Sequence, residues 1–315
     1  MKPNLIILTG PTAVGKSALS VRLAQELNGE IISADSMQVY RGMDIGSAKI
    51  KVEEMQGIPH YLIDELDPRE EFNIVQFQRL AKKYISAILE KGKIPMLVGG
   101  TGFYIQSVLY DIDFTETEQE TAYREYLSEL AEKEGVSCLH ARLKEIDPEA
   151  ASQIHKNNVK RIIRALEYHH QTGRRISEHN LREREKDAAY DACYFVLNDD
   201  RTSIYERIDA RVDQMIADGL VQEVRQLQEL GCTADMVAMQ GLGYKEILAY
   251  LNGTYTLEEA VYIIKRDTRH FAKRQLTWFK RERDVIWLNK PDYQYDDELI
   301  LKEMISMIQQ RFTQE

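Results

Sequence analysis

The residues best placed to do chemistry form one glycine-rich stretch near the N-terminus, with the pattern G-x-x-x-x-G-K-S. An apolar run, Leu5–Leu8, precedes this stretch, and a segment with helical character, Ala18–Ala24, follows it. Strand, loop and helix in this order are the context in which the pattern is a P-loop, whose backbone amides and helix N-terminus bind phosphate. The stretch therefore predicts a site for a diphosphate or triphosphate, made by Gly10, Pro11, Thr12, Ala13, Val14, Gly15, Lys16 and Ser17.

Two side chains of this loop have distinct predicted tasks. Lys16 supplies a full positive charge to the phosphates, and the Ser17 hydroxyl is the type of group that binds a magnesium ion bridging two phosphates. We therefore expect Mg²⁺ as the cofactor, with Ser17 as its protein ligand.

The other carboxylate and glycine motifs decide which phosphate chemistry fits. A hydrolytic P-loop enzyme needs a strand that ends in aspartate, but the strand predicted over Ile94–Val98 leads into Gly99-Gly100-Thr101. A second predicted strand, Glu30–Asp35, does end in a carboxylate at the ligand edge of a parallel sheet. Asp35 could accept a proton there, from a hydroxyl or from an attacking amine. The alternative is a purely structural helix N-cap.

The elements that must position these residues alternate between strand and helix. Strands are predicted at Leu5–Leu8, Glu30–Asp35, His60–Ile63, Ile94–Val98, Ala192–Leu197 and Val285–Leu288. Helices are predicted at Phe72–Lys91, Ile204–Gln214, Leu220–Leu230 and from a capping box at Thr256 onwards. This order predicts an α/β fold, with a P-loop open parallel sheet flanked by helices.

Residues 116–189 contain no convincing strand, and charged residues dominate them. Helical patterns cover Tyr123–Glu134, Ser137–Ile146 and Asn158–Gln171. We therefore predict an all-helical insertion domain over residues 116–189, and a P-loop core built from residues 1–115 plus 190–315.

Composition and charge limit the classes of partner. No apolar run approaches the ~20 residues that span a bilayer, and no secretory pattern is readable, so we expect a cytoplasmic protein without a membrane partner. Three scattered cysteines, Cys138, Cys193 and Cys232, give no metal or disulfide framework. The net charge is −10, yet residues 156–186 carry +5 and residues 265–283 carry +6. Such local basic segments suit a polyanion, although two solvated helix faces would give the same pattern.

Five motifs in order resemble the bacterial tRNA dimethylallyltransferase family, from residue 5 to about residue 288. They are G-P-T-A-V-G-K-S, D-S-M-Q-V-Y-R-G-M-D-I-G-S-A-K (residues 35–49), G-G-T-G-F-Y (99–104), G-L-G-Y-K-E (241–246) and K-R-Q-L-T-W-F (273–279). The resemblance implies transfer of a dimethylallyl group from its diphosphate to the exocyclic amine of the adenosine 3′-adjacent to the anticodon. The acceptors are tRNAs that read codons starting with U, and diphosphate is released.

The resemblance also implies roles for particular residues. Asp35 would be the general base, Ser17 and Arg207 would serve the diphosphate, and Thr101 would lie near both substrates. Contacts with the tRNA anticodon stem-loop would come from Asp35, Ser36, Met37, Gln38, Thr101, Val159, Lys160, Arg161, Ile162, Ile163, Gly241, Gly243, Tyr244, Lys273 and Arg274. Dimethylallyl diphosphate would be the second substrate, and the protein is expected to be a monomer.

Three other functions fit parts of the sequence. A P-loop small-molecule kinase would use ATP, with the helical insertion as its lid. A nucleotide-gated RNA-binding module would bind tRNA without changing its mass. An enzyme of the same family could instead prenylate free AMP or ADP, but the two basic segments favour a polyanionic acceptor over a mononucleotide.

Overall fold

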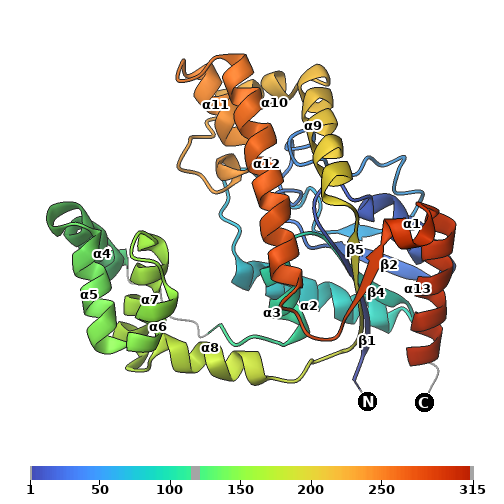
Figure 1. Cartoon of the computed structure of the whole chain (residues 1–315), viewed down its shortest axis with the longest axis horizontal. Helices are drawn as coiled ribbons and strands as arrows, with labels where there is room; N and C mark the ends of the chain where they lie inside the picture. The colour runs from blue at the N-terminus through green and yellow to red at the C-terminus, as the bar shows by residue number, and fades with distance from the viewer. Residues whose placement is uncertain (1, 115–120, 313–315) are drawn as a thin grey trace. The chain divides into compact units, whose positions relative to one another are not determined.

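A computed structural model describes residues 2–114 and 121–312 of the protein (Figure 1). They form two compact units, which we call the sheet unit and the helical unit. The sheet unit comprises the segments up to Asp111 and from Ala188 onwards, and the helical unit comprises Ile112–Asp187. The predicted start of the insertion, residue 116, lies outside the described residues, and its predicted end, residue 189, lies two residues beyond Asp187.

The sheet unit is built on a six-stranded, all-parallel sheet with the strand order β3-β2-β4-β1-β5-β6. The strands are β1 (Asn4–Thr9), β2 (Gly29–Ser33), β3 (His60–Tyr61), β4 (Ile94–Val98), β5 (Asp191–Asn198) and β6 (Val285–Asn289). In the centre of the sheet, Ile7 of β1 pairs with Leu97 of β4 and with Tyr194 of β5. The predicted fold class is confirmed, and each predicted strand is present.

Two strands end earlier than the sequence predicts. The prediction for β3 extended to Ile63, but Leu62 has a φ of 61°, so the chain leaves the extended conformation directly after Tyr61. The prediction for β2 extended to Asp35, but the strand ends at Ser33. Asp35 therefore belongs to the loop beyond the sheet edge.

Helices cover both faces of the sheet. On one face α1 (Lys16–Glu26) and α13 (Asp297–Phe312) share a core with Ile6 and Leu8 of β1. The intervening residue Ile7 is equally buried and points to the other face, as strand alternation requires. On that face α2 (Ile74–Glu90) packs against β2 and β4, beside α3 (Gly102–Leu109).

Four further helices of the sheet unit pack together: α9 (Arg201–Ala217), α10 (Leu220–Glu229), α11 (Tyr244–Leu251) and α12 (Leu257–Phe279) (Figure 1). The capping box predicted for α12 is present, with the Thr256 side chain accepting a hydrogen bond from the Glu259 amide. The short 3₁₀ helices η1 (Ala238–Gln240) and η2 (Lys290–Tyr293) complete this unit.

The helical unit contains α4 (Thr121–Glu134), α5 (Val136–Ile146), α6 (Pro148–Gln153), α7 (Val159–Thr172) and α8 (Ile176–Glu185). It has its own hydrophobic core, centred on buried leucines and isoleucines of α4, α5 and α7 such as Leu127, Leu139 and Ile162. Within the described residues of the whole chain, no helix is both long and apolar enough to cross a membrane.

Candidate functional site

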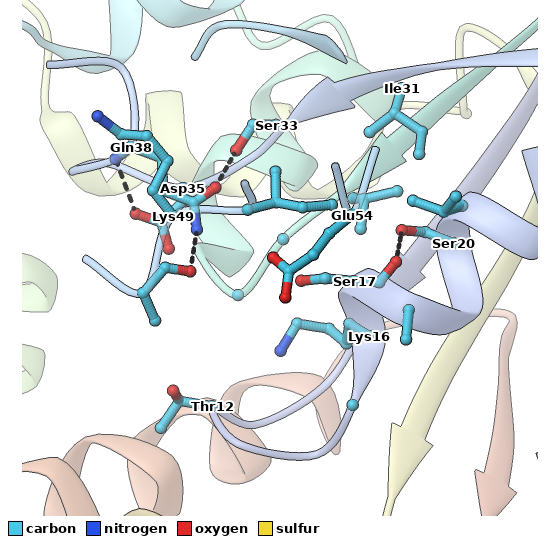
Figure 2. A pocket seen from close by; sticks show the side chains of 18 of the residues that line it. Thr12, Lys16, Ser17, Ser20, Ile31, Ser33, Asp35, Gln38, Lys49 and Glu54 are labelled. Carbon is cyan, nitrogen blue, oxygen red and sulfur yellow. Dashed lines mark hydrogen bonds between the residues drawn. The ribbon is translucent and has the colours of Figure 1, made fainter. Parts of the chain in front are cut away.

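The P-loop joins β1 to α1 and forms one wall of a pocket of about 600 Å³ (Figure 2). Thr12 to Ser17 all line this pocket. Gly10 is required by sterics, because a Cβ at this position would lie 2.1 Å from the Leu197 carbonyl oxygen. The close approach of the loop to β5 fixes its curl, and the first residues of α1 line the pocket, so the N-terminus of this helix can favour an anion there.

Lys16 brings the positive charge of the loop into the pocket. Its Nζ donates hydrogen bonds to the carbonyls of Gly10 (3.0 Å) and Pro11 (2.8 Å). Burial, followed by repulsion from Arg211, lowers the pKa of Lys16 to about 7, while Asp35 opposes the shift. An anion in the pocket would therefore strengthen the protonated form of Lys16.

Two arginines of α9, Arg207 and Arg211, lie near the P-loop, whereas the sequence predicts a diphosphate contact for Arg207 alone. Arg207 is not among the residues that line the pocket, but its guanidinium donates to the Ala13 carbonyl (2.9 Å) and to Asp199 (2.5 Å), so it holds the P-loop at Ala13. Arg211, one turn later, does line the pocket. Desolvation, and then the charge of Arg207, lower the pKa of Arg211. The phosphate contact of Arg207 stays a prediction, and Arg211, for which the sequence predicts no role, is the arginine that lines the pocket.

Asp35 lies across the pocket from Lys16 in a turn after β2. Its Oδ1 accepts hydrogen bonds from the amides of Met37 (2.8 Å) and Gln38 (3.4 Å). The alternative role as a helix N-cap is wrong, because the following residues form a turn and not a helix. Among the residues that the structure describes, no donor occupies Oδ2. Burial raises the pKa of Asp35, although the two amides and Lys16 act against that shift.

The loop after β4 closes the same pocket from another side. Gly99 and Gly100 line the pocket, and Thr101 follows at the N-cap of α3. The Thr101 amide donates to the Ala34 carbonyl (3.2 Å), which holds this loop beside Asp35. Thr101 itself does not line the pocket, so its predicted position near both substrates is only adjacent.

A buried glutamine of α12 ties two of these loops together. The Gln275 side-chain oxygen accepts a hydrogen bond from the Thr12 amide (2.9 Å), and its nitrogen donates to the Gly100 carbonyl (3.0 Å). Gln275 has no sequence signal of a site residue, because its spacing fits an ordinary packing stripe on α12.

The donor set suits Mg²⁺ that is shared with a bound diphosphate. Ser17 lines the pocket together with Asp35 and Glu54, as Figure 2 shows. The described residues contain no group of three or more His, Cys, Asp or Glu side chains that could enclose a metal. Mg²⁺ commonly binds through few protein ligands plus phosphate oxygens and water, so the residues present fit this ion.

Three predicted adenosine-binding residues follow Asp35, and the structure separates them. Gln38 lines the pocket, and its oxygen accepts a hydrogen bond from Ser33 (3.0 Å). Ser36 and Met37 do not line the pocket. Met37 packs against the G-L-G-Y-K-E motif, since a Cβ on Gly241 would lie 2.7 Å from the Met37 sulfur.

The predicted tRNA contacts of that motif need correction. Tyr244 is fully buried, and its hydroxyl donates to Glu223 (2.8 Å). The amide of Gly243 is taken by the Glu246 carboxylate (2.8 Å), which caps α11. Gly241, Gly243 and Tyr244 thus serve packing and helix capping inside the sheet unit. The buried Tyr244 side chain cannot reach a ligand at the surface.

In the helical unit the predicted segment Val159–Ile163 divides in two. Lys160 and Arg161 are exposed at the start of α7, as a nucleic-acid contact requires. Ile162 and Ile163 are 0% and 7% exposed and belong to the core, with Val159 packed against it. The prediction is therefore corrected for these three apolar residues, whose side chains stabilise the unit.

The basic segment of α12 is also divided. Lys265, Arg266 and Arg269 form ion pairs with Asp213, Asp267 and Asp209, which reduces their net attraction for a polyanion. The next turns line an open groove, made by His270, Lys273, Arg274, Thr277, Trp278 and Arg281. Lys273 and Arg274, both predicted contacts, are exposed in this groove.

Taken together, this arrangement can bind a diphosphate against Lys16 and Arg211 and present a carboxylate to a group that loses a proton. The chain resembles known proteins over 99% of its length. A family model described as IPP transferase matches residues 38–282. The tRNA dimethylallyltransferase of Lachnoclostridium phytofermentans is 60% identical over 311 residues, covering 99% of both chains. That of Acetivibrio thermocellus is 50% identical over 94% of this chain and 95% of its own.

Solved structures agree with the sequence relatives. The full-length tRNA isopentenylpyrophosphate transferase of Bacillus halodurans is 43% identical, covers 99% of each chain and gives a TM-score of 0.74. A eukaryotic dimethylallyltransferase acting on tRNA is 31% identical over 91% of this chain and 74% of its own, with a TM-score of 0.77. The chain belongs to the IPP transferase family.

Proposed function

We propose that this protein transfers a dimethylallyl group from dimethylallyl diphosphate to the exocyclic amine of the adenosine 3′-adjacent to the anticodon, in tRNAs reading codons that start with U. The observation that carries the proposal is one pocket with phosphate-binding groups, Lys16 and Arg211, and a facing carboxylate, Asp35. The strand that would supply a Walker B aspartate, β4, is followed by Gly99 and Gly100 instead. Relatives named tRNA dimethylallyltransferase support this activity over that of a small-molecule kinase.

In the proposed reaction, the bond between the allylic carbon and the diphosphate oxygen breaks, and the electron pair leaves with the diphosphate. Lys16, Arg211 and the P-loop amides stabilise the charge that develops on that oxygen. Mg²⁺, held by Ser17 and phosphate oxygens, would add positive charge at the leaving group. Arg207 keeps the P-loop in position through the Ala13 carbonyl.

The adenine amine forms the new carbon–nitrogen bond and gives up one proton. Asp35 is the acceptor, because its Oδ1 is held by two amides while Oδ2 is available to the amine. The adenosine must leave the stacked anticodon loop to reach this pocket. Lys160 and Arg161, and separately Lys273 and Arg274, are the exposed cations that would bind tRNA phosphates.

The experiment is incubation of the purified protein with Mg²⁺, dimethylallyl diphosphate and an unmodified anticodon stem-loop, followed by mass spectrometry of its nucleosides. We expect one adenosine to gain a dimethylallyl group in place of a hydrogen, with release of diphosphate. Phosphate release from ATP would support a kinase, modification of free AMP would support a mononucleotide prenyltransferase, and binding without a mass change would support an RNA-binding module. A cytoplasmic, monomeric enzyme is part of the proposal, and gel filtration tests the second point.

A further inference from the structure

A buried carboxylate outside the pocket, Glu223 of α10, makes an unusual set of hydrogen bonds. Its Oε2 accepts from the amides of Asp44 (2.9 Å) and Ile45 (2.7 Å), and its Oε1 accepts from the Gly46 amide (3.1 Å). Three successive backbone donors therefore converge on one side chain, which is only 8% exposed. Charge-assisted bonds of this kind are stronger than neutral ones, so the loop at 44–46 is held firmly.

Tyr244 of α11 completes this arrangement. Its hydroxyl donates to Glu223 Oε1 (2.8 Å) and accepts from the Ser47 amide (3.1 Å). The ring lies so close that a Cβ on Gly46 would be 2.5 Å from its Cζ. We call Glu223 and Tyr244 the loop clamp. Since α10 and α11 pack against each other, the clamp is a fixed point of the sheet unit (Figure 1).

The clamped loop continues directly into the pocket wall. Ser47 and Ala48 line the pocket, and their carbonyls accept hydrogen bonds from the Gln38 side-chain nitrogen (3.4 Å each). The backbone amide of Gln38 in turn donates to Asp35 Oδ1 (3.4 Å). A continuous chain of contacts thus runs from Glu223 through the loop and Gln38 to the proposed general base.

We propose that the loop clamp is a positioning device for the reaction, which sets the wall at residues 47–48 and, through Gln38, the Asp35 end of the pocket. The proposal rests on the proposed function for its kinetic consequence. The clamp does not touch the substrates, because Tyr244 is 0% exposed and neither residue lines the pocket. The clamp connects two motifs of the chain, since Tyr244 belongs to G-L-G-Y-K-E and its hydroxyl accepts from the Ser47 amide in D-I-G-S-A-K.

The test compares Glu223→Gln with a matched control, Glu30→Gln. Glu30 is 2% exposed and accepts hydrogen bonds from Tyr61, Lys91 and Lys93, but its side chain does not line the pocket. In Glu223→Gln one carboxylate oxygen becomes an NH₂ group, which cannot accept from the loop amides. Tyr244→Phe is a milder second variant that removes only the hydroxyl.

The first readout is hydrogen exchange at the amides of residues 44–46, which does not depend on the proposed function. In Glu223→Gln we expect exchange there to be at least ~10-fold faster than in the parent, and in Tyr244→Phe a smaller increase. Glu30→Gln should leave these amides unchanged. Equal exchange in the parent and in Glu223→Gln would show that the clamp does not hold the loop.

The second readout is single-turnover prenyl transfer. We expect Glu223→Gln to lower the rate by ~10- to 100-fold, as misplacement of reacting groups does, while tRNA affinity stays within about threefold. A rate loss no greater than that of Glu30→Gln, despite faster loop exchange, would overturn the positioning role. Absence of transfer in the parent would instead contradict the proposed function, and the exchange result would still decide whether the clamp exists.

Discussion

The glycines of the sheet unit's pocket edge and those of the helical unit are used for different reasons. Around the pocket, a Cβ on Gly10, Gly46 or Gly99 would lie 2.1 to 2.5 Å from a neighbouring heavy atom. In the helical unit, a Cβ on Gly135 or Gly173 would meet nothing within 4 Å. The first set is fixed by atomic contacts, and the second serves turns. The shape of the pocket therefore requires glycine at particular positions, because no side chain fits there. The fold of the helical unit requires only turns between its helices.

Polar side chains show the same difference. At the pocket they join segments far apart in sequence, as Gln275 does with Thr12 and Gly100. In the helical unit Lys160 and Arg161 are exposed on α7 above a self-contained apolar core. We expect single substitutions at the pocket to change chemistry strongly, and charge changes on α7 to change affinity gradually.

The largest effect is expected for Asp35→Asn. The asparagine oxygen can still accept the hydrogen bonds from Met37 and Gln38, so the turn is preserved while the proton acceptor is lost. Single-turnover transfer should fall ~100- to 10,000-fold, the usual range for general-base assistance. A filter-binding measurement should give nearly unchanged tRNA affinity. A rate within a fewfold of the parent would leave Asp35 without a catalytic role.

The next largest effects are expected for the cations of the phosphate site. Lys16→Ala and Arg211→Ala should each lower kcat/KM for dimethylallyl diphosphate by ~100-fold or more, because each removes charge stabilisation at the leaving group. Arg207→Ala should lower turnover and also thermal stability, because Arg207 braces Ala13 and pairs with the buried Asp199. Full activity of Arg211→Ala alongside inactive, stable Arg207→Ala would restore the original sequence-based assignment.

The pH dependence of activity distinguishes Lys16 on one side of the pocket from Asp35 on the other. The pKa of Lys16 is lowered to about 7, so kcat/KM for the diphosphate should fall as pH rises through about 7. The pKa of Asp35 is raised, so activity should fall at low pH beginning above the usual range of a carboxyl group. Lys16→Arg should remove the alkaline decrease, since a guanidinium stays charged. An unchanged alkaline limb in this variant would assign that limb to another group.

A smaller and more gradual effect is expected on α7. Charge reversal of Lys160 and Arg161 together should weaken tRNA binding, and each lost phosphate contact should reduce the slope of log affinity against log salt by about 0.7 to 0.9. Affinity for dimethylallyl diphosphate should not change. The matched control is reversal of Lys133 at the end of α4, which already pairs with Glu129. Unchanged tRNA affinity at moderate salt would exclude α7 from the interface.

The smallest effect should come from Gly173→Ala in the helical unit, with Gly46→Ala in the sheet unit as its comparison. Gly173→Ala places a side chain at a φ of 67° in open space, so it should cost about 1 kcal/mol of unfolding free energy and leave turnover within a fewfold. Gly46→Ala forces a Cβ against the buried Tyr244 ring and should cost about 1–3 kcal/mol together with a loss of turnover. Urea unfolding and single-turnover rates measure both. Equal kinetic effects would remove the distinction between the two regions.

Local patterns were sufficient to predict the P-loop, the presence of the six strands and a place for Asp35 at the carboxyl edge of the sheet, although β2 ends two residues before Asp35. Apolar runs bounded by glycine are readable without tertiary contacts, and parallel strands bring their carboxyl ends to one edge. The end of β3 was not readable, because the left-handed conformation of Leu62 has no sequence signal in this chain.

Other site residues required tertiary information. Arg207 and Arg211 are one helical turn apart, so sequence spacing alone cannot tell which of them faces the pocket. Ile162 and Tyr244 lie within motifs assigned to tRNA contact, but the structure shows that packing accounts for them. Glu223 has no motif of its own around it, and only the folded loop brings three amides to its carboxylate.

The two-sided hydrogen bonding of Gln275 has a mechanical consequence for the proposed reaction. Gln275 follows Lys273 and Arg274 on α12, so the helix that lines the basic groove is also tied to the P-loop. A shift of α12 caused by a nucleic acid in the groove would change the hydrogen bond between the Thr12 amide and Gln275. By linkage, whatever factor an RNA adds to diphosphate affinity, diphosphate adds to RNA affinity. Gln275 would then be one residue through which the two substrates affect each other's affinity.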